Sequence, residues 1–182
     1  MVNIYKVKFT LLQQEIMRFL FANAGKNFNA RTIALALEVS QAAVSKALPK
    51  LEKENLVNVI KDKTTGRLSI ELNRDNKKVI ELKRVENLRV IYDSEIVEFL
   101  YHEFPEATII LFGSYSYGED TITSDVDIAM IRVREKEINL NEFNKKLGKE
   151  IILHFYPNFK EINKNLKGNI LNGILLKGGI EL

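Results

Sequence analysis

The stretch Leu111-Phe-Gly-Ser-Tyr-Ser-Tyr-Gly-Glu-Asp-Thr-Ile-Thr-Ser-Asp-Val-Asp-Ile-Ala-Met-Ile131 holds two short motifs between two apolar runs. Gly113-Ser114 ends the first run, and ten residues later Asp125-x-Asp127 opens the second. A glycine lets the backbone approach a phosphate closely, and Ser114 can open a helix with its hydroxyl and amides aimed at an anion. Aspartates at i and i+2 of a strand share one face and can clamp Mg²⁺ on a triphosphate. The spacing therefore predicts a metal-dependent phosphate site.

The residues around these motifs predict a small α+β domain with a mixed sheet and flanking helices. The continuous apolar run at 107–112 is typical of a buried strand. Further strands are expected at 126–133 and 150–156, and helices at 141–148 and over most of 159–172. The glycine-rich, apolar segment 167–179 either packs under the sheet or lines a base pocket, and packing is the commoner outcome.

About residues 95–182 resemble the minimal nucleotidyltransferase family, the smallest members of the DNA polymerase beta-like superfamily. The resemblance implies transfer of a nucleoside monophosphate from ATP or another nucleoside triphosphate to a hydroxyl, with release of pyrophosphate. It also implies two Mg²⁺ (or Mn²⁺) ions held by three carboxylates. Asp125 and Asp127 are then metal ligands and catalytic residues, and Gly113, Ser114 and Ser124 are candidates for nucleotide binding.

The third carboxylate is where this sequence departs from the family pattern. The position that aligns with it is Ile152, in Leu147-Gly-Lys-Glu-Ile-Ile-Leu-His-Phe155. Glu150 lies two residues earlier on the same strand face and is a candidate catalytic replacement, or else an ordinary surface acid. His154 lies two residues later and is either a base or nucleotide contact, or a structural histidine.

An arginine that family members often carry shortly after Gly-Ser is also missing. Tyr115 and Tyr117 stand in that region. The negative charge of a phosphate would then have to be met elsewhere, and Lys145 and Lys146 are both candidates.

The front half of the chain predicts three helices followed by a hairpin. Apolar residues recur at helical spacing over 10–24 and 30–37, and Ser40 is a suitable N-cap for a third helix running to about residue 53. Alternating segments at 56–60 and 67–72 flank a Gly-containing turn.

Residues 40–57 resemble the recognition helix and following strand of winged helix-turn-helix regulators, particularly the MarR-like and ArsR-like groups. In that geometry the outward side chains of the recognition helix meet the major groove, and the wing contacts the backbone or the minor groove. A protein-interaction module is the alternative. The expected DNA contacts are Gln41, Ser45, Lys46 and Lys50 on the helix, and Lys61, Lys63 and Arg67 on the wing.

The half of the chain with the helix-turn-helix pattern is basic, and the half with the Gly-Ser and Asp-x-Asp motifs is acidic. Residues 1–85 hold 16 Lys+Arg and 8 Asp+Glu, a net of +8, whereas residues 86–182 hold 11 and 16, a net of −5. A basic half suits a polyanion, and an acidic half suits a site that collects cations. With no cysteine and two histidines, thiolate and histidine-rich metal sites are excluded.

We expect three segments: a winged helix-turn-helix at 1–75, a linking helix at 76–104 and a nucleotidyltransferase domain at 105–182. Between 76 and 103 apolar residues repeat at helical spacing without Pro or Gly, so one long helix or two abutting ones are expected. No signal peptide or membrane span is evident, so a cytoplasmic protein is expected.

Two functions remain open at this level. The first is an enzyme that modifies a hydroxyl of a protein or small molecule, as antitoxins of this family do to partner toxins. The second is a transcription regulator whose transferase-like domain senses a nucleotide or a partner without turnover, because the third carboxylate is missing. A pure interaction scaffold is a weaker third option. A homodimer is expected in either case, because winged-helix proteins usually read two half-sites.

Overall fold

The computed structural model describes residues 8–61 and 68–181. The chain divides into two compact units, Met1–Val79 and Ile80–Leu182, each with its own core. Within the described residues, no helix is both long and apolar enough to cross a membrane.

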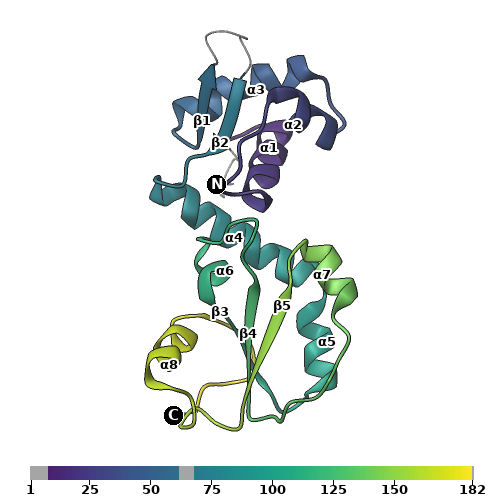
Figure 1. The fold of residues 1–182 in the computed structure, drawn as a ribbon, viewed down its shortest axis with the longest axis vertical. Coiled ribbons are helices and arrows are strands. Elements are labelled where there is room, and N and C mark those ends of the chain that lie inside the picture. The colour runs from purple at the N-terminus through teal and green to yellow at the C-terminus, as the bar shows by residue number, and fades with distance from the viewer. Residues whose placement is uncertain (1–7, 62–67, 182) are drawn as a thin grey trace, which may run out of the picture. The chain divides into compact units, whose positions relative to one another are not determined.

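The N-terminal unit is a winged helix-turn-helix built from three helices and a two-stranded antiparallel sheet (Figure 1). Each helix begins at a residue whose side chain accepts a hydrogen bond from the first turn: Thr10, Asn29 and Ser40. The N-cap predicted at Ser40 is therefore confirmed. The elements are α1 (Leu11–Ala22), α2 (Ala30–Ala36), α3 (Gln41–Lys53), β1 (Val57–Lys61) and β2 (Leu68–Leu72).

The apolar periodicity of this unit matches its core. In α3, Val44, Ala47, Leu48 and Leu51 recur at helical spacing and are buried against α1 and α2. The two strands pair in register from Val57–Leu72 to Lys61–Leu68. Most of the turn of the wing lies outside the described residues.

The C-terminal unit is a four-stranded mixed sheet with helices on both faces (Figure 1). The strand order is β5-β4-β3-β6, and only the β4–β5 pair is parallel. The unit contains α4 (Lys77–Asp93, which begins in the N-terminal unit), α5 (Ile96–Glu103), β3 (Thr108–Phe112), α6 (Gly113–Tyr117), β4 (Val126–Ile131), α7 (Asn141–Leu147), β5 (Ile151–Tyr156), α8 (Lys164–Leu171) and β6 (Ile174–Lys177).

Alternate residues of the central strands bury two separate cores. One face of the sheet packs against α5 and α7, and it includes Ile109 and Leu111 of β3. The opposite face packs against α8 and the segment before it, and it includes Ile110 and Phe112 of the same strand. Because β3 is covered on both faces, all five of its residues are buried, as its continuous apolar run predicted.

Two details differ from what the sequence indicated. The last helix begins at Lys164, not near 159, because Asn163 caps it. The segment 174–177 is an edge strand, β6, which pairs with β3. The residue before it is Gly173, and a larger side chain does not fit there because its Cβ would lie 2.4 Å from the Leu111 carbonyl oxygen. The helical stretch 76–103 is two helices, which is one of the two arrangements expected from the sequence, and Glu95 between them adopts a left-handed conformation, with φ 66°.

Candidate nucleotide site and DNA-binding surface

The turn at the end of β3 is built around Gly113 and Asp127. Gly113 has φ +71°, and β4 places Asp127 directly beside Phe112 in the antiparallel ladder. A Cβ on Gly113 would lie 2.5 Å from Oδ2 of Asp127, so no side chain fits there. Glycine is therefore required both by the backbone conformation and by the carboxylate that lies over the turn.

His154 on β5 is the second partner of Asp127. Its Nε2 lies 2.9 Å from Oδ1 of Asp127, and its ring packs edge-on to Phe112 with 5.1 Å between centroids. The side chains of His154 and Asp127 are 31% and 28% exposed, so both are accessible from solvent. The sequence left open whether His154 is functional or structural, and the structure places it directly at the Asp127 carboxylate.

Asp125 lies just before β4 and is exposed. The loop that leads to it is closed by Ser124, whose hydroxyl accepts a hydrogen bond from the Thr121 amide at 3.0 Å. Ser124 therefore shapes the loop in this structure. Ser114, the other predicted nucleotide-binding serine, is half-buried in α6.

The position opposite Asp127 on β5 is occupied by Ile152. Glu150, the proposed replacement for the third acid, is exposed at the start of that strand, where its carbonyl oxygen accepts a hydrogen bond from Val126 at 2.8 Å. In the part of the chain that is described, no three His, Asp or Glu side chains gather closely enough to hold one metal ion. Asp125, Asp127 and Glu150 are thus not brought together as a three-carboxylate set.

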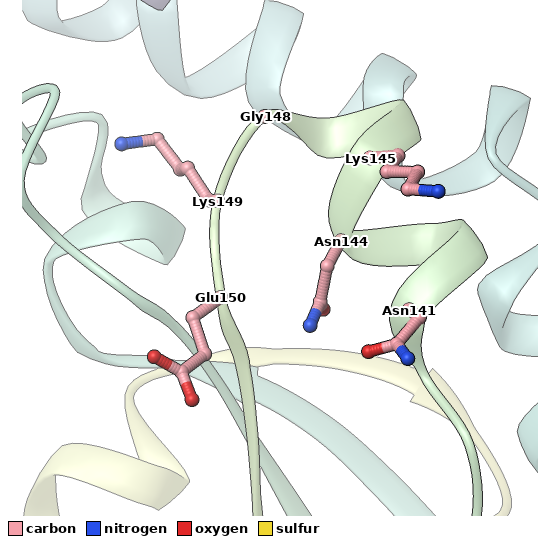
Figure 2. A pocket seen from close by; sticks show the side chains of 6 residues that line it. All are labelled: Asn141, Asn144, Lys145, Gly148, Lys149 and Glu150. Atoms are coloured by element: carbon pink, nitrogen blue, oxygen red, sulfur yellow. The ribbon is translucent and has the colours of Figure 1, made fainter.

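Glu150 instead borders an open pocket of about 500 Å³ between α7 and the start of β5. Figure 2 shows the Glu150 side chain directed away from the two asparagines of α7 that line the same pocket. The lining residues are Asn141, Asn144, Lys145, Gly148, Lys149 and Glu150.

The donor set here fits one divalent cation better than two. Asp125 and Asp127 offer carboxylate oxygens, the ligands that Mg²⁺ and Mn²⁺ prefer. His154 engages one oxygen of Asp127, and the aliphatic Ile152 stands opposite Asp127, at the position where the pattern of the resembled family has a third carboxylate. The two-metal arrangement therefore does not fit the described residues.

The lysines expected to meet phosphate charge lie elsewhere. Lys146 pairs with Glu142 at 3.3 Å and lies 3.4 Å from the Ser94 carbonyl oxygen. Lys145 is exposed, and in Figure 2 it points away from β5. A lysine that does contact the loop before Asp125 is Lys149, whose ammonium group donates to the carbonyl oxygens of Thr121 and Ser124, and nothing in the sequence indicated this contact.

On the N-terminal unit, the predicted recognition face is exposed at Gln41, Ser45 and Lys46. Lys50 is exposed too, but its ammonium group donates to the Lys8 carbonyl oxygen and lies 5.4 Å from the centre of the Phe9 ring. Lys61 is exposed at the end of β1, whereas Lys63 and Arg67 lie outside the described residues.

The family model of the nucleotidyltransferase domain matches residues 93–176, and the C-terminal unit of this chain is a nucleotidyltransferase domain joined to a winged helix-turn-helix. No curated protein matches the chain.

Several solved structures of bacterial proteins are similar to about half of the chain. They include the adhesin competence repressor AdcR from Streptococcus pyogenes (24% identity, 53% of this chain and 69% of that chain, TM-score 0.38). The zinc-responsive MarR family member ZitR from Lactococcus lactis is 25% identical over 55% of this chain and 66% of that chain, with TM-score 0.40. MepR from S. aureus, in a complex with DNA, is 24% identical over 53% of this chain and 76% of that chain, with TM-score 0.38.

Proposed function

We propose that the protein is a DNA-binding regulator whose nucleotidyltransferase domain binds a nucleoside triphosphate together with one divalent cation, Mg²⁺ or Mn²⁺. Asp125 and Asp127 would hold the cation, and the turn at Gly113 would accept the phosphates. The close fit of Asp127 over Gly113 supports this assignment, because it brings a carboxylate to a turn where the backbone is open to an anion.

The observation that carries the regulatory interpretation is the register of β4 and β5. Ile152 stands opposite Asp127, where a third carboxylate would be needed to hold a second ion. In two-metal phosphoryl transfer, the ions stabilise the attacking and leaving oxygens. Here the chain's own residues supply ligands for one ion, which favours binding of the nucleotide without turnover.

DNA would bind at the N-terminal unit. Gln41 and Ser45 can hydrogen-bond base edges, and Lys46 can contact either a base or a phosphate. The net charge of +8 over residues 1–85 supports a polyanionic partner. Two half-sites would be read by a homodimer, and affinity would fall steeply as salt rises.

A second function, transfer of the nucleoside monophosphate, is favoured by one observation. The His154 imidazole lies beside Asp127 and is accessible to solvent, so it could accept the proton of an attacking hydroxyl. The acceptor would be a hydroxyl of a small molecule or of a partner protein such as a toxin. Transfer by this protein would then rely on two carboxylates, Asp125 and Asp127, whereas the two-metal arrangement uses three.

One experiment separates these functions. ATP is titrated calorimetrically into the full-length protein with Mg²⁺, with Mn²⁺ and with EDTA, and the incubated samples are then weighed by mass spectrometry alongside a pyrophosphate assay. The test variant is Asp125→Ala/Asp127→Ala, and Glu135→Ala/Glu137→Ala is a control that removes the same charge at exposed positions of the same unit.

Cation-dependent binding that is lost only in the Asp125/Asp127 variant supports the regulator. A mass gain on a protein acceptor or release of pyrophosphate by the wild type supports the enzyme. If ATP does not bind with either cation, the nucleotide function is wrong, and DNA binding is left as the function of the chain.

A further inference from the structure

Three charged side chains from distant parts of the sequence meet in the interior of the C-terminal unit. Lys83 of α4 and Asp120, in the loop between α6 and β4, are each 1% exposed, and Lys149, just before β5, is 5% exposed. Lys83 donates to Oδ1 of Asp120, and Lys149 lies 3.3 Å from Oδ2. Buried charges of this kind are costly unless they are paired and hydrogen-bonded.

Asn87 links Asp120 to α6, the short helix that begins at the Gly113 turn. The Asn87 side-chain amide donates to Oδ1 of Asp120 at 2.7 Å and to the Tyr115 carbonyl oxygen, in α6, at 2.9 Å. Lys83 and Asn87 are one helical turn apart and both point inward from α4. The loop and the short helix after Gly113 are thus fixed to the same face of the same helix.

Lys149 contacts the loop that leads to Asp125 directly. Its ammonium group donates to the Thr121 carbonyl oxygen and, at 3.2 Å, to the carbonyl oxygen of Ser124, the residue immediately before Asp125. Oδ2 of Asp120 has no hydrogen-bond partner among the described residues, although it lies close to Lys149. The hydrogen bonds of Lys149 therefore go to the loop backbone, and its relation to Asp120 is electrostatic.

We infer that Lys149 is a positioning residue for the nucleotide site, holding the 121–125 loop so that Asp125 can join Asp127 at the cation, with Asp120 holding Lys149 in place. This inference rests on the proposed nucleotide and cation binding. Lys149 reaches the cation only through the backbone of the loop, so it is not itself a ligand. Residues that orient metal ligands in this way typically affect metal affinity by about 10–100-fold.

The ion pair between Lys83 and Asp120 makes the inference testable. Lys149→Met leaves this pair in place, so the variant should fold. Lys83→Met is the matched control, because it removes the same charge from the same cluster and leaves the hydrogen bonds of Lys149 to Thr121 and Ser124. Lys149→Arg retains hydrogen-bond donors and should restore part of the function.

The experiment is calorimetric titration of ATP into the full-length variants, once with Mn²⁺ and once with EDTA, with thermal unfolding measured on the same samples. Lys149→Met is expected to weaken binding of ATP with Mn²⁺ by about 10-fold or more. Binding in EDTA should change less than about twofold, because the turn at Gly113 is untouched. A purely structural role would weaken both affinities together.

Amide hydrogen exchange of residues 119–126 in the wild type provides a second measurement that does not depend on a variant folding. A loop held in place by Lys149 is protected before any ligand is added, and its protection changes little with ATP and Mn²⁺. A loop that becomes protected only on binding would overturn the inference, as would unchanged Mn²⁺-dependent affinity in Lys149→Met. If the wild type binds no ATP under any condition, the proposed function itself fails, and this inference fails with it.

Discussion

Nε2 of His154 lies 2.9 Å from Oδ1 of Asp127, whereas the side chain directly opposite Asp127 on the same strand is the aliphatic Ile152. The carboxylate of Asp127 is thus oriented by an imidazole on one side and by the Gly113 turn on the other. This arrangement makes Asp127 the centre of the site and gives each neighbour a distinct, testable role.

Replacing His154 by leucine removes the hydrogen bond to Asp127 and should weaken Mn²⁺-dependent ATP binding about fivefold. Hydrogen bonds to charged groups are worth about 1.5–3 kcal/mol when buried, and less when both partners are about a third exposed. His154→Gln, whose amide nitrogen can reach a similar place, should retain most of the affinity. Equal calorimetric affinities for the leucine variant and the wild type would contradict an orienting role.

Substituting Ile152 by aspartate places a third carboxylate opposite Asp127. The added charge should strengthen divalent-cation binding by about 1–4 kcal/mol, the size of one charge interaction at about 4 Å in a partly solvated site. Titration of Mn²⁺ followed by electron paramagnetic resonance measures the affinity, and Ile152→Asn is the neutral control. Appearance of pyrophosphate release only in Ile152→Asp would show that the missing carboxylate is what limits turnover.

Gly113→Ala should both destabilise the C-terminal unit and displace Asp127. A left-handed backbone costs an alanine about 1–2 kcal/mol. The new methyl would also lie 2.5 Å from Oδ2 of Asp127. Gly148→Ala is a close control, because Gly148 has φ 66° and nothing lies within 4 Å of its added Cβ.

Both glycine variants should therefore lower the unfolding temperature, and Gly113→Ala should lower it further. Only Gly113→Ala should reduce Mn²⁺-dependent ATP binding. The prediction fails if the two variants unfold and bind ATP alike.

On the N-terminal unit, Lys46→Ala should reduce DNA affinity and lower the slope of log affinity against log salt by about 1, as expected for one lost phosphate contact. Lys26→Ala removes the same charge from an exposed position outside α3 and should leave the slope unchanged. Fluorescence anisotropy over a salt series measures both. An unchanged slope in Lys46→Ala would remove this lysine from the DNA interface.

We expect the buried Tyr115 to make the C-terminal unit less stable at strongly alkaline pH. Burial, and then the nearby Asp120 and Glu86 charges, raise the pKa of Tyr115 well above its usual value of 10.0. Its contribution to stability is complete below pH 10, where the unfolded chain also keeps the proton. That contribution is lost as the pH rises above 10 toward the folded pKa.

Tyr115→Phe should therefore flatten the loss of stability above pH 10, as measured by denaturant unfolding at a series of pH values. Absorbance titration of the wild-type tyrosines at about 295 nm should leave one phenol protonated until the protein unfolds. A variant that loses stability as steeply as the wild type would assign the alkaline limit to other groups.

Sequence patterns identified most elements because local signals and burial agree there. The five apolar residues of β3, the N-cap at Ser40 and the inward face of α3 follow directly from composition and periodicity. Periodicity failed at α4, where Leu82 and Val85 belong to the apolar repeat but are 38% and 69% exposed. The positions of α4 that are buried here are instead the polar residues Lys83 and Asn87, and Asp120 accepts a hydrogen bond from each of them.

The sequence by itself indicated a strand that ends at Gly113 and a second strand that carries Asp127, because runs of apolar residues along the chain mark buried strands. Alignment with the pattern of the family that it resembles also placed Ile152 where a third carboxylate is expected. Only the tertiary structure decided that His154 contacts Asp127 and that Lys149 holds the loop before Asp125. These contacts join residues about 25 positions apart or more. Their energies depend on burial and on hydrogen-bond geometry, which emerge only when strands and helices pack.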